Sequence, residues 1–221
     1  MQKIIEKLNV PKVILRYIIM NFTDIETIKN VILNVKIMNV LDNHSKNILE
    51  KARKGFRYNC ENGYLTVAKW LYFLDNGNLN FDYEFNFYFR LACENGHLTV
   101  AEWLYSFDRV NIHANNEYAF RWACANGHLA VAKWLYDLGD VDIHVHNETA
   151  FDVSCERGHL AVAKWLYVLG DVNIHTDNEY AFRYSCKNGH LAVAKWLYSL
   201  GGIDIHKYEY ALRRFGEQIL N

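Results

Sequence analysis

Cysteine and histidine recur together at a fixed spacing, and these two residue types could bind a metal. A Cys-x3-His pair occurs four times, at Cys93 and His97, Cys124 and His128, Cys155 and His159, and Cys186 and His190. One pair could supply two of the four ligands of a structural zinc ion. Pairs that belong to successive copies of a repeat point into their own copies and do not converge. We therefore expect no metal site, and we interpret the cysteines as compact core residues and the histidines as turn residues that bond to backbone groups.

A second histidine series could sense pH, because histidine titrates near neutrality. Its members are His113, His144, His175 and His206, with His146 beside them. The alternative is a loop residue that was copied with its repeat, and we favour this alternative.

Catalytic patterns are missing from the sequence. We find no nucleophile beside a base, no glycine-rich phosphate loop and no carboxylate pair outside the repeated pattern. The recurring glycines are expected to end helices, and they are Gly63, Gly96, Gly127, Gly158 and Gly189. We therefore expect a protein that is not an enzyme and needs no cofactor.

Composition narrows the class of protein further. The chain has 221 residues, 51% of them hydrophobic, which can supply a core and argues against disorder. Lys and Arg number 24 against 25 Asp and Glu, so the basic excess typical of nucleic-acid binding is missing. No apolar run approaches the ~20 residues of a membrane-spanning helix. Without a secretion signal, five cysteines indicate reduced thiols, so we expect a cytoplasmic protein, with a nuclear location as the alternative.

The same text recurs five times along the chain. Cys60, Cys93, Cys124, Cys155 and Cys186 are separated by 33, 31, 31 and 31 residues, and Trp70, Trp103, Trp134, Trp165 and Trp196 keep the same steps. Each copy reads like CANGHLAVAKWLY. Self-similarity at such a period predicts a solenoid of stacked units. We expect Trp134, Trp165 and Trp196 to pack at the seams between units.

One unit, from Asn147 to Asn178, shows the expected elements. Asn147 can cap a first helix that ends at Gly158, and a second helix with a broad apolar stripe follows at once and ends at Gly170. Residues 172–175 then alternate as an extended segment. Helices of ~8–10 residues are not stable alone in water, so neighbouring units must supply the missing burial.

This pattern resembles the ankyrin repeat. Thr149-Ala150-Phe151-Asp152 stands where that family has T-P-L-H, and Gly158-His159 matches its G-H. The resemblance implies an all-α ankyrin-repeat solenoid, with a helix-turn-helix and a short hairpin finger in each unit. It extends over residues 54–215, and we assign residues 53–221 to five repeats and a partial capping repeat. Tetratricopeptide repeats are the competing helical solenoid, but they lack a non-helical finger.

Two departures from the family pattern carry expectations. The step is mostly 31 residues rather than 33, so the fingers should be short. The histidine of T-P-L-H is replaced by Arg121, Asp152 and Arg183, so we do not expect the hydrogen bonds between repeats that this histidine makes in the family.

Residues 1–52 do not follow the repeat. Their apolar spacing predicts helices, and the opening of the segment resembles an F-box, whose family binds the Skp1 adaptor of cullin-type ubiquitin ligases. The docking residues implied by this resemblance are Val10, Pro11, Ile14, Leu15 and Ile18. The alternative is a helical cap that shields the first repeat. An F-box before such repeats, and the repeat text itself, also resemble the ankyrin proteins of amoeba-infecting giant DNA viruses, which would place the protein in the host cytoplasm.

The positions that vary between copies are the best candidates for partner binding. In ankyrin proteins one face of the first helix and the finger tips line a concave groove. The residues implied here are Leu91, Glu94, Asn115, Trp122, Ala125, His146, Val153, Glu156, Arg157, Asp177, Tyr184 and Lys187. The alternative for Trp122 and Tyr184 is that they fill gaps between units. We expect a monomer that binds a protein partner. The F-box resemblance implies a Skp1-like adaptor as a further partner. The alternative function is a structural scaffold or virion component.

Overall fold

The computed structural model describes residues 48–74, 85–209, 213 and 218, and this part of the chain is helical without strands. Its helices form five antiparallel pairs, which we call units 1 to 5. The pairs are α4 (Ile48–Glu61) with α5 (Leu65–Leu74), α6 (Phe85–Glu94) with α7 (Leu98–Tyr105), α8 (Ala114–Ala125) with α9 (Leu129–Asp137), α10 (Val145–Glu156) with α11 (Leu160–Leu169), and α12 (Thr176–Asn188) with α13 (Leu191–Ser199). A 3-10 turn, η1 (Ile205–Lys207), follows unit 5. The prediction of an all-α solenoid is confirmed.

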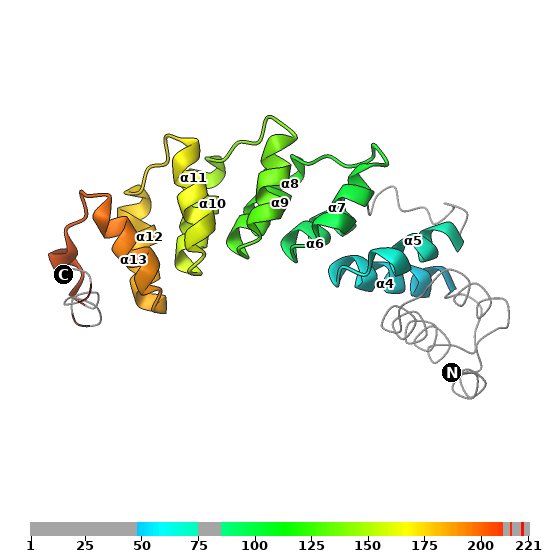
Figure 1. Cartoon of the computed structure of the whole chain (residues 1–221), viewed down its shortest axis with the longest axis horizontal. Coiled ribbons are helices and arrows are strands. Elements are labelled where there is room, and N and C mark those ends of the chain that lie inside the picture. Colours follow the sequence, from blue (N-terminus) through cyan, green and yellow to red (C-terminus); the bar gives the residue numbers. More distant parts are fainter. Residues whose placement is uncertain (1–47, 75–84, 210–212, 214–217, 219–221) are drawn as a thin grey trace.

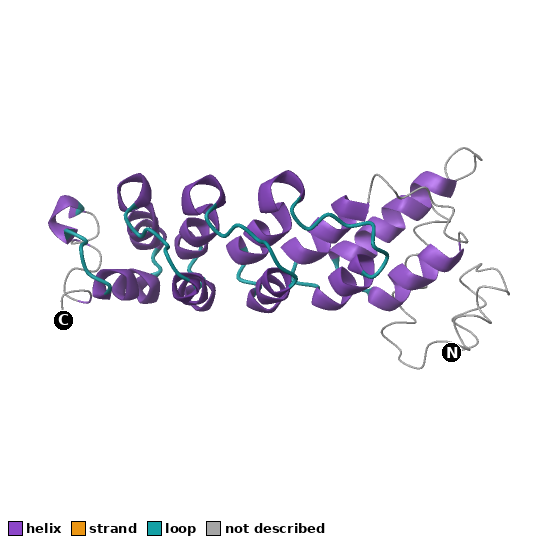
Figure 2. Ribbon diagram, turned by 90° about the horizontal axis from the view of Figure 1, so that it is seen from above, coloured by secondary structure: helices purple, strands orange, loops and turns teal. Residues whose placement is uncertain are grey.

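The units stand side by side in one row that follows an arc (Figure 1). Each first helix packs on the second helix of its own unit and on the first helix of the next, so that α4, α6, α8, α10 and α12 form a continuous layer. The backbones of successive second helices come close at few points. Seen from above, the loops run between the two rows of helices (Figure 2). The first helices therefore form the more closely packed of the two layers.

Glycine ends each first helix as expected. Gly127 has φ of 80°, and its N–H donates to the Cys124 carbonyl at 3.0 Å while the His128 N–H donates to the Ala123 carbonyl at 2.8 Å. This pair of bonds is the Schellman arrangement, which needs a left-handed residue that glycine adopts without steric cost.

The start of the first helices differs from the prediction. Asparagine was expected to cap them through its side chain, but no side chain caps α8, α10 or α12. Instead Asn115, Asn116 and Glu117 open α8 with φ of 55–58°. Arg121 stabilises this left-handed turn, because its guanidinium donates to the carbonyls of Asn116 at 2.7 Å and Asn115 at 3.2 Å.

The connecting fingers are built from turns. The segment before α12, expected to be extended, contains no strand in the described structure. The Asn173 side chain accepts a hydrogen bond from the His175 N–H at 3.0 Å, which closes an Asx turn. The same turn recurs at Asn111, Asp142 and Asp204. Short polar side chains therefore organise the shortened fingers locally.

The core is a column of aromatic and small residues. One phenylalanine from each first helix is at most 1% exposed, and these are Phe56, Phe89, Phe120, Phe151 and Phe182. Each tryptophan of the last four units reaches back to the preceding unit. Trp165, for example, lies 6.1 Å from Phe120 and 5.8 Å from Tyr136, between ring centroids. The seam packing expected for Trp134, Trp165 and Trp196 is confirmed, and Trp103 packs in the same way; the four rings are half-buried.

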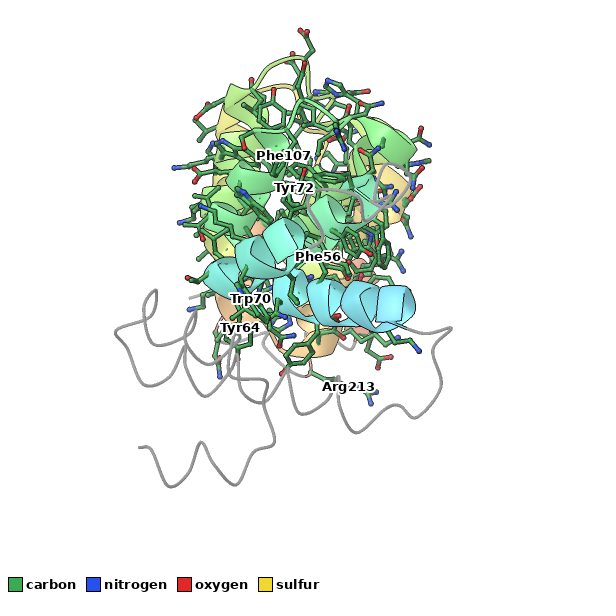
Figure 3. All side chains as sticks on the ribbon, turned by 90° about the vertical axis from the view of Figure 1, so that its right-hand side faces the viewer. Phe56, Tyr64, Trp70, Tyr72, Phe107 and Arg213 are labelled. Atoms are coloured by element: carbon green, nitrogen blue, oxygen red, sulfur yellow. The ribbon has the colours of Figure 1, made fainter. Side chains whose placement is uncertain are left out.

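The first units show the same packing at the end of the stack. Figure 3 looks along the row from the end that carries α4 and labels Phe56, Tyr72 and Phe107 among the stacked side chains. The Tyr72 and Phe107 ring centroids are 4.8 Å apart, although the two residues belong to successive units. Aromatic contacts thus join unit 1 to unit 2 as they join the later units.

Several expectations fall on other parts of the chain. Val10, Pro11, Ile14, Leu15 and Ile18 lie outside the described residues, as does most of the expected C-terminal capping helix, of which Arg213 is described. In the described part, no helix combines the length and the apolar character needed to cross a membrane.

Candidate functional site

The outer side of the first-helix layer, which we call the first-helix face, carries two pockets in equivalent places. The smaller, of about 110 Å³, lies between α6 and α8. The larger, of about 180 Å³, lies between α8 and α10. Four of its lining positions lie 31 residues after lining positions of the smaller pocket: Arg121 corresponds to Arg90, Trp122 to Leu91, Ala125 to Glu94 and Thr149 to Tyr118.

Most of the predicted partner-binding residues come together in these pockets. Leu91, Glu94 and Asn115 line the smaller one with Phe87, Arg90 and Tyr118. Trp122, Ala125, Val153, Glu156 and Arg157 line the larger one with Arg121 and Thr149. The sequence reasoning missed Phe87, Arg90, Tyr118, Arg121 and Thr149. The variation at residues 118, 149 and 180 in equivalent positions was the signal that could have found Tyr118 and Thr149.

The other predicted residues lie outside the two pockets. On α12, the Lys187 ammonium is 5.2 Å from the centre of the Tyr184 ring, and the Tyr180 and Tyr184 rings stack at 4.2 Å. At the fingers, the His146 Nε2 lies 3.2 Å from the Asn116 amide nitrogen. The Asp177 carbonyl accepts a hydrogen bond from Arg183 at 3.1 Å.

Trp122 forms one wall of the larger pocket. The Arg157 guanidinium, from the next unit, lies over its ring at 5.2 Å, and the Tyr118 ring lies 5.7 Å away on its own helix. Arg157 also donates a hydrogen bond to the Asn126 side chain, which fixes the guanidinium. A half-buried tryptophan beside an oriented arginine has the composition of a binding hot spot.

A tyrosine pairs with a glutamate across the seam on either side of this pocket. Tyr118 donates to a Glu94 carboxylate oxygen at 3.3 Å, and Tyr180 donates to Glu156 at 2.6 Å. Burial, reinforced by the neighbouring carboxylate, raises the pKa of Tyr118 and of Tyr180 above the ordinary tyrosine value. Both hydroxyls therefore stay protonated and keep donating to the carboxylates.

Asp152 stands where units 3 and 5 carry arginine. It is 5% exposed, and the Thr176 hydroxyl of the next unit lies 3.2 Å from its carboxylate. Burial raises the pKa of the Asp152 carboxyl to about 7, against the opposing effect of the Thr176 hydrogen bond. The aspartate thus makes a bond between units, whereas Arg121 and Arg183 bond within their own.

The histidines of the Cys-x3-His series bond to the backbone, as expected, and their bonds cross the seams. His97 Nε2 is 2.9 Å from the Glu61 carbonyl of the preceding unit. A Cβ on Gly63 would stand 2.4 Å from the His97 ring, so this glycine also makes room for the next unit. Burial lowers the pKa of His128 and His159 below the ordinary histidine value, which favours the neutral ring.

The second histidine series pairs with glutamates that sequence reasoning missed. His113 Nδ1 is 2.7 Å from Glu117, and His144 Nδ1 is 2.8 Å from Glu148. Both glutamates are 6% exposed, and the second carboxylate oxygen of each has no hydrogen-bond partner in the described structure. These pairs lie at the base of the fingers, and the glutamate recurs with the histidine, as in His175 and Glu179 at 3.6 Å.

The cysteines are core residues. All five are free and buried, with no exposed surface, and burial raises the pKa of Cys60, Cys93 and Cys124 well above the ordinary thiol value. Over the residues that the structure describes, no group of three or more histidine, cysteine, aspartate or glutamate side chains could hold a metal ion.

Comparison with known proteins agrees with this architecture. The family model described as ankyrin repeats (3 copies) matches residues 56–147 and 89–178, which together extend over more than half of the chain. No curated protein matches the sequence. Among solved structures, the crystal structure of the human ASB11 ankyrin repeat domain has a similar fold, with a TM-score of 0.51 and 19% sequence identity. The similarity covers 67% of this chain and 69% of that chain.

Proposed function

Because the chain belongs to the ankyrin-repeat family, whose fold is a scaffold for protein–protein interaction, we propose that it binds a protein partner on its concave first-helix face. The single observation that carries this proposal is the pair of pockets on that face, which occupy equivalent places in successive units. They gather aromatic and arginine side chains, the types enriched where binding energy concentrates. The proposed function involves no catalysis.

The proposed contact surface follows the first helices from α6 to α12. Its residues are Leu91, Glu94, Asn115, Trp122, Ala125, His146, Val153, Glu156, Arg157, Asp177, Tyr184 and Lys187, with Arg90 and Arg121 added by the pockets. Its centre is the pocket beside Trp122, and the tyrosine pair on α12 extends it toward the C-terminal end.

The test compares partner capture by the whole chain and by variants of this face. Bait protein is incubated with cytoplasmic extract, and the captured proteins are identified by mass spectrometry. We expect a specific partner to be retained by wild-type protein and lost with Trp122→Ala combined with Tyr184→Ala. The matched control is Val168→Ser on α11, where the side chain is 80% exposed away from this face. Equal capture by the double variant and the control would contradict the proposal.

A sharper form of the proposal makes the protein a substrate adaptor. The F-box-like residues 10–18 would dock a Skp1-like adaptor of a cullin-type ubiquitin ligase, and the repeats would present the target. The support is the resemblance of Val10, Pro11 and Ile14 to an F-box opening. Co-purification with Skp1 that is lost on substitution of Pro11 and Ile14 is the expected result. Retained partner binding without any Skp1 would favour the alternative, a scaffold or virion component.

A further inference from the structure

At three of the four described seams of the first-helix face, the same position carries an aromatic ring. The residues at this position, in chain order, are Phe87, Tyr118, Thr149 and Tyr180. Tyr118 faces Glu94 of the preceding unit, and Tyr180 faces Glu156 in the same way. Thr149 instead faces Ala125, which stands at the position of these glutamates. In the seam between α8 and α10 both members of the tyrosine–glutamate pair are thus small residues. This double replacement opens the pocket of about 180 Å³.

The seam that lacks the ring keeps the arginine that covers this ring in other seams. In the first two seams an arginine of one unit lies over the ring of the next: Arg57 lies 5.1 Å from the centre of Phe87, and Arg90 lies 5.1 Å from that of Tyr118. Arg121 is the equivalent residue in the third seam and lines the pocket, but Thr149 offers it no ring. Its side chain is held in place by hydrogen bonds to the carbonyls of Asn115 and Asn116.

The rest of the pocket suits an aromatic guest. Ala125 and Val153 supply apolar contacts, and Trp122 forms a wall that the Arg157 guanidinium covers at 5.2 Å. Aromatic rings gain from offset or edge contacts with other rings and from cations over their faces. An aliphatic side chain would fill the space without these gains.

The arginines of the first-helix face favour a partner segment with acidic residues on either side of its aromatic side chain. Arg90, Arg121 and Arg157 line the two pockets, against the carboxylates of Glu94 and Glu156. Each of these carboxylates already accepts a tyrosine hydroxyl. Carboxylates of a partner on either side of the guest ring would lie near the arginines, and this local charge complementarity would favour an acidic segment.

We propose that the pocket between α8 and α10 binds an aromatic side chain of an extended acidic segment of the partner, in the place that a tyrosine of the chain itself occupies in the neighbouring seams. This inference rests on the proposed function and adds the chemistry of the partner. The guest ring would lie between the Arg121 guanidinium on one side and Ala125 and Val153 on the other, with its edge beside Trp122.

The neighbouring seams supply the variant that tests the pocket. Ala125→Glu combined with Thr149→Tyr rebuilds the pair found at Tyr118 and Tyr180, so it narrows the pocket toward the smaller volume found between α6 and α8, with a contact this fold already accommodates. Thr149→Tyr alone is the second variant, in case the double variant folds poorly. Circular dichroism and the melting temperature are measured for each whole-length protein, and Val168→Ser serves as the control.

The probes are fluorescein-labelled peptides of alternating aspartate and glutamate with one central residue, which is tyrosine, phenylalanine, leucine, alanine or lysine. By fluorescence anisotropy we expect the aromatic peptides to bind wild-type protein and the control about tenfold more tightly than the alanine peptide. The preference should disappear in both pocket-filling variants, and binding should weaken as salt rises. An aromatic preference that is missing, or that survives in a folded pocket-filling variant, overturns the inference.

The partner captured from extract separates this inference from the proposed function. If Ala125→Glu with Thr149→Tyr keeps the partner while Trp122→Ala with Tyr184→Ala loses it, the face binds a protein but the pocket chemistry is wrong. If both variants keep the partner, the proposed function fails as well. If both lose it, and a second copy of this chain is not what was captured, the two proposals stand together.

Discussion

Trp122 and Trp165 are half-buried side chains of the same type in different surroundings. Trp165 packs across a seam near the fully buried Phe120, whereas Trp122 contacts Arg157 and Tyr118 on the first-helix face. We expect Trp165→Ala to lower the free energy of unfolding by about 2–3 kcal/mol, less than a fully buried tryptophan would. Trp122→Ala should cost about 1 kcal/mol or less, in line with an exposed cation–π contact.

Urea denaturation followed by circular dichroism measures both effects, and partner capture measures the second role of Trp122. An equal loss of stability in the two variants would show that Trp122 serves the seam rather than the partner.

Asp152 gives one seam a dependence on pH. Its pKa is raised to about 7 by burial, so the folded protein holds a proton there that the unfolded chain releases near pH 4. Because the folded state binds more protons between these values, stability falls as pH rises through the window. We expect the loss to amount to roughly 2–4 kcal/mol by pH 8.

The Asp152→Asn variant isolates this contribution, because the amide keeps a hydrogen-bond acceptor for Thr176 without a charge. The difference in free energy of unfolding between variant and wild type should grow from pH 4 to pH 8. A difference that stays constant across this range would contradict the assignment.

Residue types in the sequence predicted the buried core better than they predicted the binding residues of the first-helix face. The repeated cysteine predicted a small buried residue, and each of the five is buried. The face was harder, because Thr149 and Ala125 become informative only once the fold places them opposite each other in one pocket. The glutamates at the base of the fingers were missed for a similar reason, since the spacing from His113 to Glu117 indicates a pair only when the backbone turn is known.

At the scale of elements, the turn between the helices of a unit joins that unit to the next. Gly127 has a left-handed backbone, and a Cβ there would stand 2.5 Å from the His159 ring. We expect Gly127→Ala to destabilise the protein by about 2 kcal/mol or more, because backbone strain and a clash between units add.

Gly201→Ala is the matched control, since Gly201 has φ of 90° and nothing within 4 Å of the added Cβ. It should show the backbone cost of about 1 kcal/mol alone. Thermal unfolding of Gly127→Ala, His159→Ala and the double variant then measures the coupling. Additive losses would mean that the glycine serves its own turn only.

The beginnings of the first helices could not be predicted from local sequence. Asn before Glu is a sound capping signal, yet Asn116 takes a left-handed conformation, in which its carbonyl accepts a hydrogen bond from Arg121, five residues later. The helix ends were predicted well, because the left-handed glycine that ends a helix is a local requirement. The sequence signal thus predicted the helix ends correctly, because one glycine is enough there. It failed at the helix beginnings, where the conformation involves residues further along the helix.

At the scale of the molecule, stability should vary along the row. Each unit contacts its neighbours only, so central units gain two interfaces and terminal ones gain fewer. We expect backbone amides in α8, α9, α10 and α11 to exchange hydrogen most slowly, with faster exchange in α4, α5 and α13. Native-state hydrogen exchange with peptide-level mass spectrometry measures this profile. Uniform protection from α4 to α13 would show that the stack unfolds as one cooperative body.

The regular placement of the thiols gives every layer of the stack its own chemical reporter. Cys60, Cys93, Cys124, Cys155 and Cys186 lie one in each unit and are buried. An alkylating reagent can therefore label a given cysteine only after the layer around it has opened. Timed labelling would date the opening of each layer separately, without any engineered probe, and would reveal which end of the molecule comes apart first when it is heated, pulled or released from a partner.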